Sequence, residues 1–569
     1  MKHYYTNERN HQILISLLKA HNIKRVVASP GTANSVFIGS IQNDPFFEIY
    51  SSVDERSAAY IACGLAYASG EPVIISCTGA TASRNYMPGL TEAYYSKLPI
   101  LCITSSQPPY RVGHLFSQVT DRSVQPNDIV RLSVTLPTVN VPAEEWECEI
   151  QANRAITELS RHGGGPVHIN LITSYGYNEI TALTCRNLPV ARQIKRVTPY
   201  DKFPELDAEK IGIFVGSHKP WSAELEQAVD LFCARHNAVV LCDHTSNYNG
   251  KYKILIALPI NQFPLIRDKK PAFDLDLLIH IGEITGEEGS PSMIRSKQTW
   301  RVSEDGEIRD YFRNLTFVFE MRESDFFNQY AHENCADNTL YQDCYNSSVQ
   351  LYKKYNEQCS PDGIVPLSNV WIAANIAPRI QQNSSVVLAI LNTLRTWNYA
   401  QFRAGVRVFC PVGGFGIDGA TSCALGIAIS DPQSITYAVV GDLAFFYDLN
   451  SLGNRHISNN IRILLINNGC GVEFKKTYAT AYKLLGEEVD PYVAAKGHFG
   501  NKSPQLVKTF AENLGFSYMA AHSKDEVLSV LPQFTSSQPT PKPLLLEVFI
   551  NDEDERTALD LIHQRIHTL

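Results

Sequence analysis

The strongest chemical signal is a carboxylate and a carboxamide that each follow an apolar run in the last third of the chain. Asp442 comes soon after the run 435–440, and Asn468 soon after the run 461–466. If these runs are neighbouring parallel strands, both side chains meet at one edge of the sheet. Carboxylate, amide and backbone carbonyl oxygens are ligands that Mg²⁺ and Ca²⁺ prefer. The plainer alternative is a strand turn with an Asp cap, followed by an Asn-Gly loop.

A second signal is Glu55, which opens an alanine-rich segment at residues 56–69 that stops at Gly70. The composition and the final glycine predict a helix. A carboxylate at a helix N-terminus complements the helix dipole, and that is the simpler interpretation. The alternative is that Glu55 takes part in proton transfer.

A third signal is the sequence GIDG at residues 416–419. Glycines allow a ligand to approach the backbone closely, because they carry no side chain. Ile417 places a bulky apolar group between Gly416 and the second glycine. A glycine-rich turn before an alanine-rich helix explains the same segment without a ligand, so both interpretations stay open.

Short apolar runs alternate with helical patterns, which predicts parallel sheets covered by helices on both faces. The expected strands are 24–28, 73–77, 100–104, 166–171, 211–215, 275–281, 386–390, 435–440, 461–466 and 544–550. Proline-rich residues 178–207 and polar residues 331–362 predict two connections. We therefore expect an α/β protein with three doubly wound parallel-sheet domains, the first and last alike. The expected domains span residues 1–180, 205–335 and 365–569.

Composition narrows the class of protein. The 569 residues are 44% hydrophobic and 19% charged, which excludes a largely disordered chain. A net charge of -8 argues against general nucleic-acid binding. The 13 cysteines are odd in number and include no CxxC pair, so we expect free thiols. With no apolar signal core or membrane-length apolar run, we expect a cytoplasmic protein with no membrane contact.

Together these motifs resemble the SEPHCHC synthase (MenD) family, within the thiamine-diphosphate-dependent decarboxylase and carboligase superfamily. The matching stretches are SPGTANS (29–35), VDERSAAY (53–60), CTGATASRNYMPGLTEA (77–93), LCITSSQPPY (101–110), LDLLIHIG (275–282), GIDG (416–419) and GDLAFFYDLNSL (441–452). The resemblance implies a pyrimidine-binding, a central and a diphosphate-binding domain, in that order. It also implies thiamine diphosphate (ThDP) and Mg²⁺ as cofactors. The active sites would lie between the subunits of a homodimer or homotetramer.

The resemblance assigns a role to each candidate residue. Glu55 would contact N1′ of the aminopyrimidine ring and help ionise the reactive carbon of the thiazolium ring. Gln118 would face the reacting substrate, and Ile417 would hold the cofactor bent. The implied magnesium ligands are Asp442, Asn468 and the carbonyl of Cys470. The other implied cofactor-binding residues are Thr78, Gly79, Gly416, Gly441, Leu443 and Ala444.

Several positions depart from the family, which surrounds the acidic substrates 2-oxoglutarate and isochorismate with arginines and a lysine. The positions where the expected basic residues are replaced are Ala33, Gln107, Ser292, Met293, Trp397 and Val412. Arg395 lies two positions before Trp397. Neutral side chains do not replace a bidentate guanidinium–carboxylate contact, so we expect a different donor, acceptor or both. Arg84 or Arg111 could supply a new anchor, whereas Lys475 and Lys476 are expected to be solvated.

The expected function is therefore ThDP- and Mg²⁺-dependent decarboxylation of a 2-oxo acid, with transfer of the acyl or aldehyde unit to an unknown acceptor. The acceptor could belong to sugar or secondary metabolism. A genuine SEPHCHC synthase of menaquinone biosynthesis is the first alternative. The second is a non-catalytic scaffold with the ThDP fold, against which the retained Glu55, Asp442 and Asn468 argue.

Overall fold

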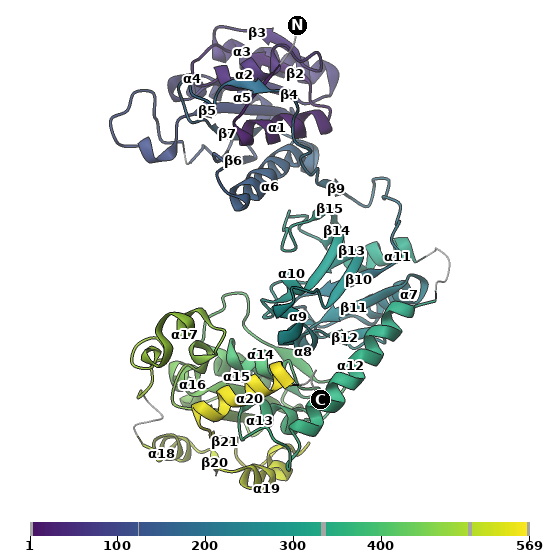
Figure 1. Cartoon of the computed structure of the whole chain (residues 1–569), viewed down its shortest axis with the longest axis vertical. Coiled ribbons are helices and arrows are strands. Elements are labelled where there is room, and N and C mark those ends of the chain that lie inside the picture. Colours follow the sequence, from purple (N-terminus) through teal and green to yellow (C-terminus); the bar gives the residue numbers. More distant parts are fainter. Residues whose placement is uncertain (1–3, 123, 332–336, 499–502, 566–569) are drawn as a thin grey trace. The chain divides into compact units, whose positions relative to one another are not determined.

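The computed structural model describes residues 4–122, 124–331, 337–498 and 503–565. The chain forms two compact units, which are residues 1–198 with 306–318 and residues 199–305 with 319–569. Figure 1 shows the helices and strands of both units in chain order.

The N-terminal unit is built on a six-stranded sheet. Its strands are β2 (Arg25–Ala28), β3 (Glu48–Ser51), β4 (Val73–Thr78), β5 (Ile100–Ser106), β6 (Leu132–Leu136) and β7 (Val167–Ile172). Its main helices are α1 (Arg9–Ala20), α2 (Ser35–Ile41), α3 (Glu55–Ser69), α4 (Ala80–Asn85), α5 (Met87–Tyr95) and α6 (Pro142–Glu158). The order is β3-β2-β4-β5-β7-β6, with parallel neighbours throughout. Ile74 and Ile75 of β4 belong to different core clusters, so both faces of the sheet are buried.

Two further sheets follow, a central sheet and a C-terminal sheet, and most of their strands belong to the second unit. The central strands are β10 (Ile211–Val215), β11 (Ala238–Cys242), β12 (Lys253–Leu255), β13 (Phe273–Ile281), β14 (Ile294–Ser303) and β15 (Leu315–Glu320). Helices of this region include α7 (Ala223–Arg235), α10 (Ser290–Met293), α11 (Glu323–Tyr330) and α12 (Thr339–Gln358). The strands from β12 to β14 are parallel neighbours in the order β12-β11-β10-β13-β14.

The C-terminal sheet carries the Asp442 and Asn468 motif. Its strands are β16 (Ser385–Leu388), β17 (Arg407–Phe409), β18 (Thr436–Gly441), β19 (Ile461–Asn467), β20 (Ser517–Ala521) and β21 (Leu544–Phe549). Its helices include α13 (Asn369–Ile376), α14 (Asn392–Trp397), α15 (Ala420–Ser430), α16 (Asp442–Tyr447), α18 (Leu506–Asn513), α19 (Lys524–Phe534) and α20 (Asp552–Arg565). The order is β17-β16-β18-β19-β21-β20, again parallel throughout.

The predicted fold class is confirmed: the chain is an α/β protein with three parallel sheets flanked by helices. When strands are numbered by chain order within each sheet, the first and last sheets both read 2-1-3-4-6-5. The two therefore share one topology, as their similar sequence patterns predicted. The domain boundaries given above remain a proposal.

Two segments expected to be irregular contain regular structure. Residues 178–207 include β8 (Leu183–Cys185), which pairs antiparallel with β1 (Tyr5–Thr6), and β9 (Lys195–Val197). Residues 331–362 contain α12, a helix of 20 residues. Within the described residues, no helix combines the length and apolar content needed to span a membrane. The 12 cysteines of the described part of the chain are free, as expected.

Candidate active site

The structure brings the Asp442 and Asn468 segments to the same edge of the C-terminal sheet. Gly441 at the end of β18 is in register with Ile466 of β19. Asp442 is the first residue of α16 and is 1% exposed, while Asn468 follows the last residue of β19. One carboxylate oxygen of Asp442, Oδ2, is buried and has no hydrogen-bond partner in the described structure. A buried oxygen without a partner is costly unless a ligand satisfies it.

The atoms around Asp442 suit a hard cation. Burial raises the pKa of Asp442 to about 7, although backbone N–H groups of Leu443 and Gly469 partly offset this. The amide oxygen of Asn468 accepts a hydrogen bond from the Cys470 N–H at 3.2 Å. Among the described residues there is no cluster of three or more His, Cys, Asp or Glu side chains that could hold a metal. Asp442, Asn468 and the carbonyl of Cys470 offer oxygen atoms of the kinds that Mg²⁺ binds beside phosphate oxygens and water.

The neighbouring GIDG segment is shaped as a close-approach loop. Gly419 has φ +96°, a left-handed conformation that favours glycine, and it immediately precedes α15. A side chain at Gly416 would meet the Asp418 carboxylate at 2.4 Å. Ile417 is half-buried and packs against the core clusters on both faces of the sheet. These contacts hold the Ile417 side chain in place.

Sequence reasoning missed Asp448, which connects two elements of this site. Asp448 is buried at the end of α16, and its carboxylate accepts hydrogen bonds from the backbone N–H and the hydroxyl of Ser422. Ser422 lies in the first turn of α15. This carboxylate therefore holds α15, and with it the GIDG loop, against α16.

In the N-terminal unit, Glu55 begins α3 as predicted. Its carboxylate is half-buried and accepts a hydrogen bond from Asn85 Nδ2 at 3.2 Å. Asp54, which precedes it, caps the helix by accepting from the Arg56 N–H. Because Asp54 already caps the helix, Glu55 is not required for that purpose.

Thr78 and Gly79 lie where β4 ends. The Gly79 N–H donates to the carbonyl of Ser105 at 2.7 Å. A side chain at Gly31 would meet Cβ of Thr78 at 2.6 Å, so the SPGTANS loop packs tightly against this strand end. The SPGTANS loop therefore contacts the end of β4 that carries Thr78 and Gly79.

Gln118 lies in an exposed loop with φ +60°. Gln107 supports this loop through two hydrogen bonds. It accepts from Arg111 Nη1 at 2.7 Å and donates to the carbonyl of Ser117 at 3.3 Å. Gln107, at a position where the family has arginine, thus shapes the loop that carries Gln118. Arg111 is held by Gln107 and packs over Phe116.

Arg122 is a buried cation that sequence reasoning also missed. Its guanidinium donates to Thr104 Oγ1 and to Asn170 Oδ1, and it lies close to Gly79. No carboxylate of the described residues forms an ion pair with it, and burial lowers its pKa. No local pattern in the sequence marks an arginine whose partners are neutral groups on two distant strands.

A cavity of about 1020 Å³ opens beside the SPGTANS loop. Its walls are the loop after β2 and the segment from Thr173 to Leu183, and none of the described residues lining it is charged. Ala33, where the family has arginine, is one of these lining residues. Hydroxyl, amide and apolar groups therefore define the ligand that this cavity can accept.

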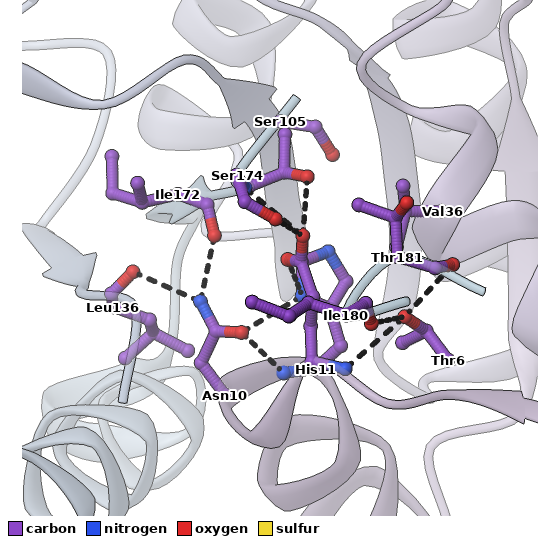
Figure 2. A network of polar contacts seen from close by, with 12 residues as sticks. Thr6, Asn10, His11, Val36, Ser105, Leu136, Ile172, Ser174, Ile180 and Thr181 are labelled. Carbon is purple, nitrogen blue, oxygen red and sulfur yellow. Dashed lines mark hydrogen bonds and ion pairs between the residues drawn. The ribbon is translucent and has the colours of Figure 1, made fainter. Parts of the chain in front are cut away.

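A buried polar network holds one wall of this cavity. Figure 2 shows the network around Asn10 and His11 at the start of α1 and Ser174 after β7. Glu8 accepts from the N–H and the hydroxyl of Ser174 and pairs with His11 at 3.0 Å. Burial would raise the pKa of Glu8, but the bonds from His11 and Ser174 outweigh burial and lower the pKa to about 2. Glu8 is therefore charged and fastens the 173–183 segment to α1.

The prediction that Lys475 and Lys476 are solvated is wrong. Lys475 is buried and pairs with Asp490 and Asp552, each at 2.6 Å. Lys476 is buried and pairs with Glu473 at 2.7 Å. The short segment after the metal motif is therefore anchored inside the domain by ion pairs, which local sequence alone does not reveal.

Comparison with known proteins shows which proteins this chain is similar to. Residues 9–125 match the family described as thiamine pyrophosphate enzyme, N-terminal TPP binding domain. The 2-succinyl-5-enolpyruvyl-6-hydroxy-3-cyclohexene-1-carboxylate (SEPHCHC) synthase of Bacteroides thetaiotaomicron is 29% identical over 98% of this chain and 99% of its own. The synthase of the same name from Phocaeicola vulgatus is 28% identical over 98% of both chains.

The solved structures include a likeness at lower similarity. Rhodococcus jostii thiamine diphosphate-dependent 4-hydroxybenzoylformate decarboxylase is 15% identical, with a TM-score of 0.40 over 95% of this chain and 99% of its own. The curated relatives from Bacteroides thetaiotaomicron and Phocaeicola vulgatus, in contrast, match along almost the whole chain. The chain is therefore MenD-like: it is similar along almost its whole length to SEPHCHC synthases, and it is an enzyme that uses thiamine diphosphate with a divalent metal ion such as Mg²⁺.

Proposed function

We propose that this enzyme decarboxylates a 2-oxo acid and transfers the resulting acyl or aldehyde unit to an acceptor. The observation that carries this proposal is the buried, unpartnered Oδ2 of Asp442 beside Asn468 at the edge of the C-terminal sheet. Asp442, Asn468 and the Cys470 carbonyl would hold Mg²⁺, and Gly441, Leu443 and Ala444 would adjoin the diphosphate.

The family resemblance gives the remaining site residues their proposed roles. Bound ThDP would supply a carbon nucleophile and an electron sink for loss of CO₂. Glu55 would hold a proton at N1′ of its aminopyrimidine ring, because its carboxylate is available at the start of α3. Ile417 would press on the cofactor from a fixed position, with Gly416 leaving room beside it. Thr78 and Gly79 would line the pyrimidine side, and Gln118 would face the substrate.

The names of the relatives favour SEPHCHC synthesis, for which the family resemblance implies 2-oxoglutarate as donor and isochorismate as acceptor. A second candidate is a different substrate pair, possible because the cavity beside Ala33 has no charged lining residue. Val412, another substituted position, is 3% exposed and belongs to the hydrophobic core, where a guanidinium would lack a partner. A neutral acceptor suits these surroundings better than a dicarboxylate does.

We also propose a homodimer or homotetramer with active sites between subunits, working in the cytoplasm on small molecules. The support is the resemblance to oligomeric ThDP enzymes, together with the absence of a membrane-spanning helix among the described residues.

The decisive experiment measures CO₂ release from a panel of 2-oxo acids, with and without ThDP and Mg²⁺. The panel includes 2-oxoglutarate, alone and with isochorismate. We expect cofactor-dependent release that Glu55→Gln reduces by about 100-fold or more, the usual size of a lost acid–base group. Asp442→Asn should abolish stabilisation of the protein by ThDP and Mg²⁺ in thermal unfolding.

The matched control is Glu147→Gln, which alters an exposed glutamate on α6 of the same unit and should leave activity unchanged. Full activity in Glu55→Gln, or unchanged cofactor stabilisation in Asp442→Asn, would contradict the assignment. Formation of SEPHCHC would establish the first substrate pair. Turnover of another donor, without formation of SEPHCHC, would establish the second.

A further inference from the structure

Arg395 is a cation at the same sheet edge as the metal motif. It lies on α14, which follows β16, and β16 is the parallel neighbour of β18, the strand that leads into Asp442. The guanidinium side chain is 18% exposed. A substrate that reacts beside a cofactor held by Asp442 would therefore approach this region. A free arginine here would be a natural anchor for a carboxylate.

Arg395 is not free, because two carboxylates of the same chain bind it. Nη2 contacts Glu288 Oε1 at 2.6 Å, and Nη1 contacts Glu473 Oε1. Glu473 also binds Lys476 at 2.7 Å, so two cations and two carboxylates form one group with no net charge. Burial would lower the pKa of Arg395, but the surrounding glutamates outweigh burial and raise it.

The two carboxylates differ in how they are held. Glu473 is largely buried and shared between two cations, so it is part of the protein interior. The Glu288 side chain is 73% exposed and reaches Arg395 from the solvent side. Glu288 therefore occupies the face of the guanidinium that a substrate carboxylate would otherwise use.

The backbone that presents Glu288 is fixed on α14. A side chain at Gly286 would meet Leu394 Cδ2 at 2.1 Å and Val412 Cγ1 at 3.9 Å, so this glycine permits close contact. Next to it, Thr285 donates to Asp243 Oδ2 at 2.8 Å. On the other side, Glu287 accepts from Asn261 Nδ2 at 3.1 Å. The loop between β13 and α10 is thus fastened on both sides of Gly286, and it covers the substituted position Val412.

We propose that Glu288 is a specificity-determining residue that covers Arg395 and selects 2-oxo acid donors without a second carboxylate. This inference rests on the proposed function for its substrate class. A donor with a distal carboxylate must displace Glu288 and then meet the negative charges of Glu288 and Glu473. A donor with a neutral side chain, such as pyruvate, needs no displacement.

The first test measures binding to the full-length holoenzyme by calorimetry, with glutarate and butyrate as unreactive probes. In Glu288→Ala we expect glutarate to bind about tenfold more tightly or better, the size of one charge-assisted hydrogen bond. Butyrate affinity should not change. The matched control is Glu304→Ala, which removes an exposed glutamate elsewhere on the central region. Adding Arg395→Gln to Glu288→Ala should cancel the gain.

The second test follows kinetics with 2-oxoglutarate and pyruvate. Glu288→Ala should lower KM for 2-oxoglutarate about tenfold, with kcat and the pyruvate KM little changed. Equal glutarate affinity in wild type and Glu288→Ala would overturn the inference. A gain that persists without Arg395 would also overturn it. A third outcome is that no donor is turned over while Glu288→Ala still binds glutarate more tightly. That outcome would reject the proposed function and support the role of Glu288.

Discussion

At the scale of single residues, His168 shows how burial sets the pH response of the N-terminal unit. It lies on β7, 4% exposed, with Nε2 bonded to Thr104 Oγ1 at 2.7 Å and Nδ1 bonded to Ser133 Oγ at 2.8 Å. Burial, and secondarily Arg122, lowers the pKa of His168 to about 3. The folded protein therefore keeps this ring neutral at pH values where the unfolded chain binds a proton.

This asymmetry predicts a pH-dependent effect of His168→Gln. The pKa of histidine in the unfolded chain is about 6.5. Below that pH, His168 lowers the free energy of unfolding by about 1.4 kcal/mol for each unit by which the pH falls. The variant lacks this loss, so its stability deficit relative to wild type should shrink by about 2 kcal/mol between pH 7.5 and pH 5. Urea unfolding at both pH values, followed by fluorescence, measures the difference.

His456→Gln, which changes an exposed histidine, is the comparison variant measured at the same two pH values. A deficit for His168→Gln that is equal at pH 7.5 and pH 5 would contradict a lowered pKa of His168 in the folded protein.

The positions of residues at strand ends could be predicted, because hydrophobic runs mark the strands in the sequence and neighbouring parallel strands end at the same edge of the sheet. Asp442 and Asn468 needed no further information for that reason. Lys475 and Arg122 could not be predicted to be buried, because Lys475 pairs with Asp490 and Asp552, 15 and 77 positions away, and Arg122 bonds to neutral groups of other strands. A charged residue in the sequence is read as solvated until its partners are known.

At the scale of elements, Asp448 joins α16 to α15 and thereby supports the GIDG loop. Its carboxylate accepts two hydrogen bonds from Ser422 in the first turn of α15, where a negative charge also complements the helix dipole. We expect Asp448→Ala to lower the free energy of unfolding by about 2–3 kcal/mol, because a charged acceptor and its buried contacts are lost.

The same variant should weaken ThDP binding, since Ile417 and its glycines are carried by the loop that α15 anchors. Chemical denaturation and a ThDP titration by fluorescence quenching measure the two effects. Ser422→Ala, which removes only the hydroxyl bond, should cost about 1 kcal/mol. Wild-type stability in Asp448→Ala would show that the two helices are held by other contacts.

Helix α12 could not be predicted from its sequence pattern. Its sequence is mostly polar, and it was expected to be a connection. Its buried side chains include Tyr352 and Tyr355, three positions apart, and its N-terminus is capped by Asn338, which accepts from the Tyr341 N–H. A narrow aromatic stripe on a polar helix is a weak signal in one sequence, whereas the wide apolar runs of the strands are a strong one.

At the scale of the whole molecule, the first and last sheets share the strand order 2-1-3-4-6-5. One carries Glu55 at the start of α3, the helix before β4, and the other carries Asp442 directly after β18. The family resemblance implies that one active site takes Glu55 from one chain and Asp442 from another. Two inactive variants can test this assembly, because each damages a different half of the site.

Glu55→Gln and Asp442→Asn should each be inactive alone and regain activity when their chains are mixed after unfolding and refolding. In a mixed dimer, one site combines both damaged residues, and the other combines intact Glu55 with intact Asp442. Random mixing makes about half of the dimers mixed, with one working site of two, so about a quarter of wild-type CO₂ release should return. Mixing either variant with itself is the control. If each site were built from a single chain, every chain in the mixture would carry a damaged site and no activity would return.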